Sequence, residues 1–462
     1  MLKQQKIFFD FLRFCIGSAK EIPDSLKKAD WKELYRIAQK QCLVGILFDG
    51  IQKLPPAEVG MKKELLLQWM AESQMLEKAN VRLNDAAIQV SEWFRKKEFR
   101  TCILKGQGNA LMYPNPYART SGDIDIWVEG GDKRVISFVR SISPHEKACY
   151  HHIEFPSYKG VEVEVHYRPS FLLSFWHNRK LQKYYERVKE EQFSHRVMLG
   201  EQGEIAIPTT EFNLIFQLTH IFSHLMNEGI GLRQLLDYYY VICDFYKVYQ
   251  NFSNHPVGLS NHPVGLSNHP VIFSNHPVPL SKEGSTFSPS PSSSGSGDVT
   301  ALRCSEPLRY KDGGASKPSP DCAGWDRLDV SGDTASDCAG ASATAALDRV
   351  QKELKELGLW KFAGGIMYIM QEVFGMPASR LIVPPNEKYG KFVLNEVLEA
   401  GNFGKYDERY WFGRLKLGHN LQRVYRDIRL VRYFPTEAMS EPIFRTWHFF
   451  WRLRWDFTYR LR

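Results

Sequence analysis

The chain has 462 residues, of which 43% are hydrophobic, enough to bury a large core spread over roughly two or three structural units. Its formal charge of +8, from 60 Lys and Arg against 52 Asp and Glu, is compatible with anionic ligands but too small to indicate a nucleic-acid-binding protein by itself. The eight cysteines form no CxxC pairs and no compact cluster, and a chain of this length needs no disulfide staples, so we expect reduced thiols in a cytoplasmic protein.

The N-terminal region, residues 1–98, is expected to be helical. Its first residues, MLKQQKIFFDFLRFCIG, are interrupted by Asp10 and Arg13 before an apolar stretch of signal-peptide type is complete. The rest of the sequence contains no run of about 18 uncharged apolar residues, so no transmembrane segment is expected. Between Met61 and Lys97, apolar residues recur at spacings of three and four, which predicts one long amphipathic helix.

The next region, residues 99–205, contains the first candidate functional residues, a pair of acids. The segment FRTCILKGQGNALMYPNPYARTSGDIDIWV predicts a strand, a glycine turn, a short helix, a loop and a second strand. Asp123 and Asp125 lie two residues apart in this second strand, so their carboxylates face one side while Ile124 and Ile126 face the core. Paired carboxylates of this kind are typical of a site for a hard divalent cation such as Mg²⁺.

A third carboxylate is needed if two metal ions assist phosphoryl transfer. The segment KGVEVEVHYRP alternates strictly, which places Glu162, Glu164 and His166 on one face of a strand and three valines on the other. Glu164 is the favoured third ligand, and Glu162, one pleat away, is the alternative. His166, on the same face, could orient a carboxylate or touch the substrate.

These motifs, in this order, resemble the bacterial uncharacterised nucleotidyltransferase family within the polymerase-beta-like nucleotidyltransferase superfamily. The resemblance covers about residues 100–170. It implies an α+β fold, in which a polymerase-beta-like core with a small mixed sheet is flanked by N- and C-terminal helical regions. It also implies transfer of a nucleoside monophosphate from a nucleoside triphosphate to a hydroxyl acceptor, with release of pyrophosphate. Two Mg²⁺ ions are expected as cofactors, with Mn²⁺ as a substitute.

The same resemblance implies two sets of site residues. The expected metal ligands and catalytic residues are Asp123, Asp125 and Glu164, and the expected nucleotide contacts are Lys105, Gly106, Gln107 and Arg119. Gln107 departs from the superfamily pattern, in which a Gly or a Ser follows the glycine. This departure is an argument for the alternative hypothesis, a catalytically silent member of the same fold that binds a nucleotide or a partner protein, whereas the intact Asp123, Asp125 and Glu164 argue against it.

Residues 206–250 are expected to form the first part of a helical domain. His220 and His224 lie four residues apart on one helix face, but a third zinc ligand is missing, so zinc is not favoured. Arg233 and Asp237, also four apart, either contact the substrate or form an intrahelical ion pair.

Residues 251–346 are expected to be a disordered, low-complexity insertion. They contain four copies of a seven-residue unit built on Asn-His-Pro, followed by a stretch rich in Gly and Ser. The proline in every unit forbids a helix. Because helical patterns flank the stretch, it is expected to interrupt the connection between two helices that pack together.

The C-terminal region, residues 347–462, is expected to complete the helical domain and to end in a basic, aromatic tail. Arginines recur at a spacing of three and drift around a helix, so no dedicated nucleic-acid groove is expected at Arg423, Arg426, Arg429 and Arg432. The tail is expected to dock on the body as a terminal helix, with a membrane-surface anchor as the alternative. The sequence leaves the acceptor, the preferred base and the oligomeric state open.

Overall fold

A computed structural model describes residues 3–55, 60–200, 203–251, 336–407, 409 and 416–460. Most of the expected insertion, residues 251–346, therefore lies outside the described residues. Its last part does not: a helix already begins at Ser336, so the helical domain resumes earlier than the sequence pattern indicated.

The centre of the fold is a small mixed sheet with the strand order β1-β2-β4-β3. Strands β2 and β4 are parallel, whereas β1 pairs with β2 and β3 pairs with β4 in antiparallel fashion. A separate two-stranded sheet joins β5 to β6. The strands are β1 (Thr101–Leu104), β2 (Ile124–Val128), β3 (His152–Tyr158), β4 (Val161–His166), β5 (Arg196–Leu199) and β6 (Gly203–Ala206).

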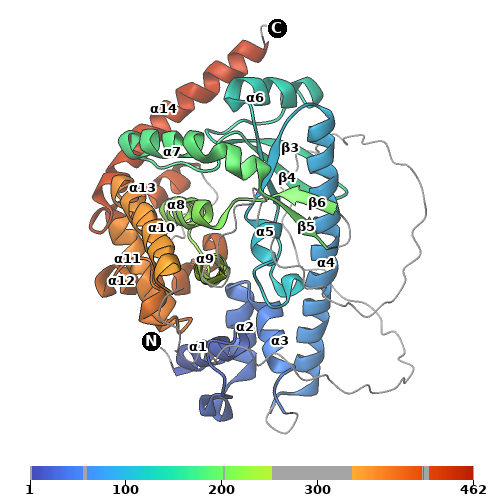
Figure 1. Cartoon of the computed structure of the whole chain (residues 1–462), viewed down its shortest axis with the longest axis vertical. Coiled ribbons are helices and arrows are strands. Elements are labelled where there is room, and N and C mark those ends of the chain that lie inside the picture. The colour runs from blue at the N-terminus through green and yellow to red at the C-terminus, as the bar shows by residue number, and fades with distance from the viewer. Residues whose placement is uncertain are drawn as a thin grey trace, which may run out of the picture.

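Helices flank this sheet on both sides, which confirms the expected α+β class (Figure 1). The N-terminal helices are α1 (Lys3–Cys15), α2 (Trp31–Lys40), α3 (Val44–Ile51) and α4 (Lys63–Lys96). Those within the sheet region are α5 (Gly106–Ala110), α6 (Gly131–Ile142) and α7 (Phe175–Ser194). The remaining α-helices are α8 (Thr210–Asn227), α9 (Leu232–Asn251), α10 (Ser336–Glu356), α11 (Trp360–Glu372), α12 (Glu387–Ala400), α13 (Lys416–Val431) and α14 (Pro435–Arg460). Single 3₁₀ turns are η1 (Asp24–Lys28), η2 (Pro116–Ala118), η3 (Ala378–Arg380) and η4 (Asn402–Gly404).

Helix α4 is the long amphipathic helix that the sequence predicts, and it runs along one side of the molecule (Figure 1). Among the helices of the described ranges, none combines the length and the apolar character that crossing a bilayer requires.

The two faces of the central sheet pack against different apolar clusters. On one face, Ile103, Ile126 and Val165 pack with residues of α4 and α6. On the other face, Leu104 and Trp127 join a larger cluster that includes the helical domain. Because strand side chains alternate, Asp125 shares its face with Trp127 and points toward the helical domain rather than toward α4. The sheet therefore presents its acids to the helices.

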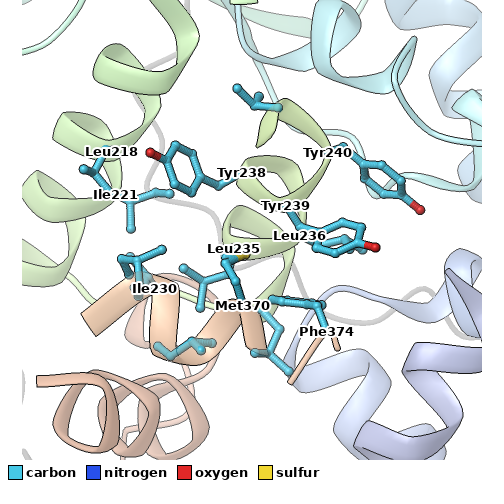
Figure 2. Close-up of a cluster of buried hydrophobic side chains, with 14 of the residues drawn as sticks. Leu218, Ile221, Ile230, Leu235, Leu236, Tyr238, Tyr239, Tyr240, Met370 and Phe374 are labelled. Carbon is cyan, nitrogen blue, oxygen red and sulfur yellow. The ribbon is translucent and has the colours of Figure 1, made fainter. Parts of the chain in front are cut away.

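The helical domain has a dense apolar centre formed by α8, α9 and α11, shown in Figure 2. Leu235 and Met370 are fully buried there, and the buried Tyr238 hydroxyl donates to the carbonyl of Leu214 at 3.0 Å. The N-terminal region contributes to the same cluster through Phe8 and Trp69, so residues 1–98 do not have a core of their own. Helix α10 packs against α8 and α9, as expected for helices on either side of an insertion.

The C-terminal helix α14 docks on the sheet region. Phe444 is buried, stacks on Phe171 and meets Tyr150 edge-on. Farther along α14, the carbonyl of Trp455 accepts a hydrogen bond of 3.0 Å from Arg140 of α6. These contacts agree with the expected docked tail, and they bring a helix more than 250 residues distant in sequence beside β3 and β4.

Candidate active site

A cavity of about 640 Å³ is lined by the acidic face of the sheet together with helices α8, α9, α13 and α14. Most of the site residues expected from the sequence line it, namely Lys105, Gly106, Arg119, Asp123, Asp125, Glu164, His166, Arg233 and Asp237. The two expected residues that do not line it are Gln107 and Glu162.

Asp125 is the centre of the polar network in this cavity. It is register partner of Glu164 across the parallel strands β2 and β4. Lys105 Nζ lies 2.9 Å from one of its carboxylate oxygens, and His166 Nε2 lies 2.9 Å from the other. Burial disfavours the charged carboxylate, but Lys105 and His166 together hold the pKa of Asp125 well below its usual range. Asp125 is therefore ionised and already paired with cations.

Glu164 belongs to the same network. Its Oε2 lies 3.4 Å from His166 Nε2, and this contact lowers the pKa of Glu164 although burial opposes ionisation. Burial likewise disfavours the His166 cation, but the hydrogen bonds to Asp125 and Glu164 raise the pKa of His166 to about 9. Ligand atoms of Asp125, Glu164 and His166 all lie within 4.8 Å of one another, close enough to share one metal ion. Glu162, the alternative third acid, is exposed and does not line the cavity.

Asp123 lies at the entrance to β2 and lines the same cavity. It is not part of either group of three ligand atoms within 4.8 Å that the described residues contain. Repulsion from Asp125, together with burial, raises the pKa of Asp123 to about 6. Two neighbouring carboxylates that resist simultaneous ionisation are a ready binding site for a cation, because a bound cation removes their repulsion.

This electrostatic coupling predicts a measurable titration. In the metal-free protein, the Asp123 carboxyl is expected to titrate near pH 6, and Asp125→Asn should move that pKa toward the ordinary value of 3.8. Carboxyl-detected NMR of protein labelled with ¹³C at aspartate measures both. Because the folded-state pKa is raised, protons compete with cations for Asp123 below about pH 6, so divalent-cation affinity should rise as the pH increases through that value. If the pKa of Asp123 were the same in Asp125→Asn as in wild type, the proposed coupling between the two carboxylates would be wrong.

The glycine turn before α5 faces the cavity through its backbone. Gly106 has a φ of +40°, a conformation that L side chains rarely adopt, and a Cβ there would meet open space. Gln107 is buried and its side chain does not line the cavity. The neighbouring Asn109 exchanges two hydrogen bonds with Gln217 of α8, at 3.1 and 2.7 Å, which fixes α5 against the helical domain.

Arg119 and Asp237 form a buried bidentate pair. Arg119 Nε and Nη2 donate to the two carboxylate oxygens of Asp237, each at 2.8 Å, and the Tyr113 hydroxyl donates to the same carboxylate at 2.7 Å. The structure thus joins Asp237 to Arg119 across the two regions, where the sequence suggested an intrahelical pair with Arg233. With its guanidinium held by Asp237, Arg119 connects the sheet region to α9, and both residues line the cavity together with Arg233.

His220 and His224 stand beside Lys105. His220 Nε2 lies 2.7 Å from Lys105 Nζ and 2.9 Å from His224 Nε2. Burial and then the charge of Lys105 keep the pKa of His220 well below normal, so the ring is a neutral acceptor for the Lys105 ammonium. Within the described residues, neither histidine belongs to a metal-sized cluster of three ligands. Their contacts position Lys105.

Sequence reasoning missed the arginines that α13 and α14 bring to the cavity, Arg423, Arg426, Arg445 and Arg452. Arg423 and Arg426 were considered only as part of a helical stripe, and Arg429 of that set pairs instead with Glu396. No local signal in the sequence places two C-terminal helices over a sheet formed near residue 125.

Sequence reasoning also missed His151 and His152, for which a signal existed. Lys159 and Gly160 form a two-residue turn in which both have positive φ, the usual connection of a β-hairpin. That hairpin makes His152 the register partner of His166.

Comparison with known proteins supports the resemblance. Residues 27–247 match the family model described as uncharacterised nucleotidyltransferase, a range that includes the whole acidic site but not α13 or α14. No curated protein matches the chain. A solved structure, the crystal structure of an antigenic nucleotidyltransferase-like protein from Paracoccidioides brasiliensis, is 15% identical, with 35% of this chain and 75% of that chain covered at a TM-score of 0.23, and so carries no argument about the fold. Over residues 27–247, the chain is therefore similar to the uncharacterised nucleotidyltransferase family.

Proposed function

We propose that the protein is a Mg²⁺-dependent nucleotidyltransferase, which moves a nucleoside monophosphate from a nucleoside triphosphate to a hydroxyl acceptor and releases pyrophosphate. The observation that carries this proposal is the cavity in which Asp125 and Glu164 lie side by side on parallel strands, with Asp123 on the same wall. The family match of residues 27–247 supports nucleotidyl transfer as the general activity.

The donor set of the cavity fits divalent cations. Mg²⁺ prefers oxygen ligands and is usually held by one or two carboxylates together with substrate phosphates. Asp123, Asp125 and Glu164 would hold the ions, and Mn²⁺ would suit the same carboxylates together with His166. When bound, such ions neutralise phosphate charge and lower the pKa of an attacking hydroxyl.

The chain's own cations are placed to receive the triphosphate. Lys105 Nζ lies between Asp125 and His220, at 2.9 and 2.7 Å, and can exchange its partner Asp125 for a phosphate oxygen once a metal ion satisfies that carboxylate. The backbone turn at Gly106 leaves room for a phosphate, because no side chain fills the space there. Arg423 and Arg445 add positive charge on another wall of the cavity. Fixed cations aimed at a transferring phosphate stabilise the charge of the transition state.

A catalytically silent member of the fold is the second candidate. One observation favours it: Asp125 is satisfied without a metal ion, because Lys105 and His166 already occupy both of its oxygens. The buried Gln107, in place of a phosphate-binding hydroxyl, points the same way. In this alternative the cavity binds a nucleotide or a partner and transfers nothing.

Transfer can be tested before the acceptor is known. The full-length protein is incubated with Mg²⁺, a cell extract and each nucleoside triphosphate, labelled at either the α- or the γ-phosphate. The proposal expects one or more acceptors to gain the α-label but not the γ-label, together with release of pyrophosphate. Gain of the γ-label would indicate a kinase, and no gain from any triphosphate in small-molecule, protein or RNA fractions would favour the silent alternative.

A further inference from the structure

Three histidines meet at the end of the β3–β4 hairpin. His151 and His152 stand at the start of β3, and His166 ends β4 as the register partner of His152. Each offers a ring nitrogen within 4.8 Å of the nitrogens of the other two, and all three line the cavity. Nothing in the proposed nucleotidyl transfer requires three imidazoles at one point.

The distances in this cluster have the scale of a metal coordination shell. His152 Nδ1 lies 3.1 Å from His151 Nε2 and 3.4 Å from Glu164 Oε2, which in turn lies 3.4 Å from His166 Nε2. Ligands of a tetrahedral zinc ion sit about 2.0–2.1 Å from the metal, which separates neighbouring donor atoms by roughly 3.4 Å. Three of the donor-atom separations are therefore close to those of a tetrahedral shell, and ring nitrogens of the three histidines all lie within 4.8 Å of one another.

One further feature suits imidazole ligation. His166 Nδ1 lies 3.3 Å from the carbonyl of Arg168, an arrangement that fixes the ring and leaves Nε2 as the coordinating atom.

We propose that His151, His152 and His166, together with Glu164, bind a transition-metal ion of borderline softness, such as Zn²⁺, beside the carboxylate of Asp125. Imidazole donors suit zinc and its first-row neighbours, whereas Mg²⁺ prefers an oxygen shell. The site shares His166 and Glu164 with the carboxylate cluster, so an ion bound there draws His166 away from Asp125. The inference does not rest on nucleotidyl transfer.

The test uses Co²⁺ as a visible stand-in for Zn²⁺, titrated into the metal-free, full-length protein without nucleotide. The four repeat histidines, His255, His262, His269 and His276, are a competing source of ligands, so the titration is run in wild type and in a variant with all four replaced by Ala. We expect one tight equivalent in both proteins, with the absorption of tetrahedral Co²⁺ and no displacement by excess Mg²⁺. His151→Ala and His152→Ala should each weaken binding at least about tenfold.

The matched control is the double variant His220→Ala/His224→Ala, which removes the other histidine pair of the same cavity and should retain the Co²⁺ site. X-ray absorption of the wild-type Co²⁺ complex gives a readout that needs no variant, and two or three imidazoles are expected in its shell. No tight binding, a shell of oxygens alone, or binding that survives both His151→Ala and His152→Ala would overturn the proposal. Each of these results leaves nucleotidyl transfer to its own test with labelled triphosphates.

Discussion

Asp125→Asn is expected to lower the rate of nucleotidyl transfer by at least about a thousandfold. Asp125 is the carboxylate shared by Lys105, His166 and the expected metal ions, and asparagine keeps its shape while removing its charge. Loss of that charge weakens cation binding and leaves Lys105 without the partner that positions it. The measurement is the rate of α-label transfer at saturating triphosphate and Mg²⁺.

The matched control is Glu162→Gln. Glu162 lies on the same face of β4 as Glu164, but it is exposed and does not line the cavity. The rate of this variant should stay close to that of wild type, and circular dichroism should show that both variants are folded at the temperature of the assay. A rate for Asp125→Asn within about tenfold of the control would remove Asp125 from the catalytic centre.

Asp237→Ala is expected to cost about 3–5 kcal/mol of the free energy of unfolding. The substitution leaves the buried guanidinium of Arg119 without its bidentate partner and also deprives the Tyr113 hydroxyl of an acceptor. An uncompensated buried charge costs far more than the loss of an exposed pair. Urea unfolding followed by tryptophan fluorescence measures the change.

Arg196→Ala provides the comparison, because Arg196 forms a pair with Glu204 at 2.6 Å on an exposed hairpin. It should cost about 1 kcal/mol or less. If Asp237→Ala were as mild as Arg196→Ala, the Arg119–Asp237 pair would not be the connection between the sheet region and α9 that the structure indicates.

The parts of the site that lie close together in sequence could be predicted from it. Strict alternation in the segment before His166 assigned Glu164 and His166 to one face, and the Asp-x-Asp spacing assigned Asp123 and Asp125 to one side of a strand. Both follow from the two-residue period of a strand, which needs no knowledge of tertiary contacts. The apolar residues that alternate with these acids, such as Ile124 and Ile126, likewise indicated that the acids lie on the face opposite to the one these isoleucines pack into.

Long-range partners could not be predicted in this way. Asp237 is four residues from Arg233, yet its carboxylate is held by Arg119, because a buried bidentate pair depends on how α9 meets the loop before β2. Similarly, the spacing of Arg423 and Arg426 describes only their own helix, whereas their approach to the acids depends on the docking of α13 and α14. The periodicity of a sequence predicts which residues share one face of a helix or strand. It does not predict which distant helix or strand packs against that face.

The most direct test of the central claim is titration calorimetry of the full-length protein with each nucleoside triphosphate, with and without Mg²⁺, beside Asp125→Asn. It requires no acceptor. We expect at least one triphosphate to bind in a Mg²⁺-dependent manner and this binding to be lost in Asp125→Asn. Failure of every triphosphate to bind, with Mg²⁺ or without it, would contradict the assignment of this cavity to a metal-bound nucleotide.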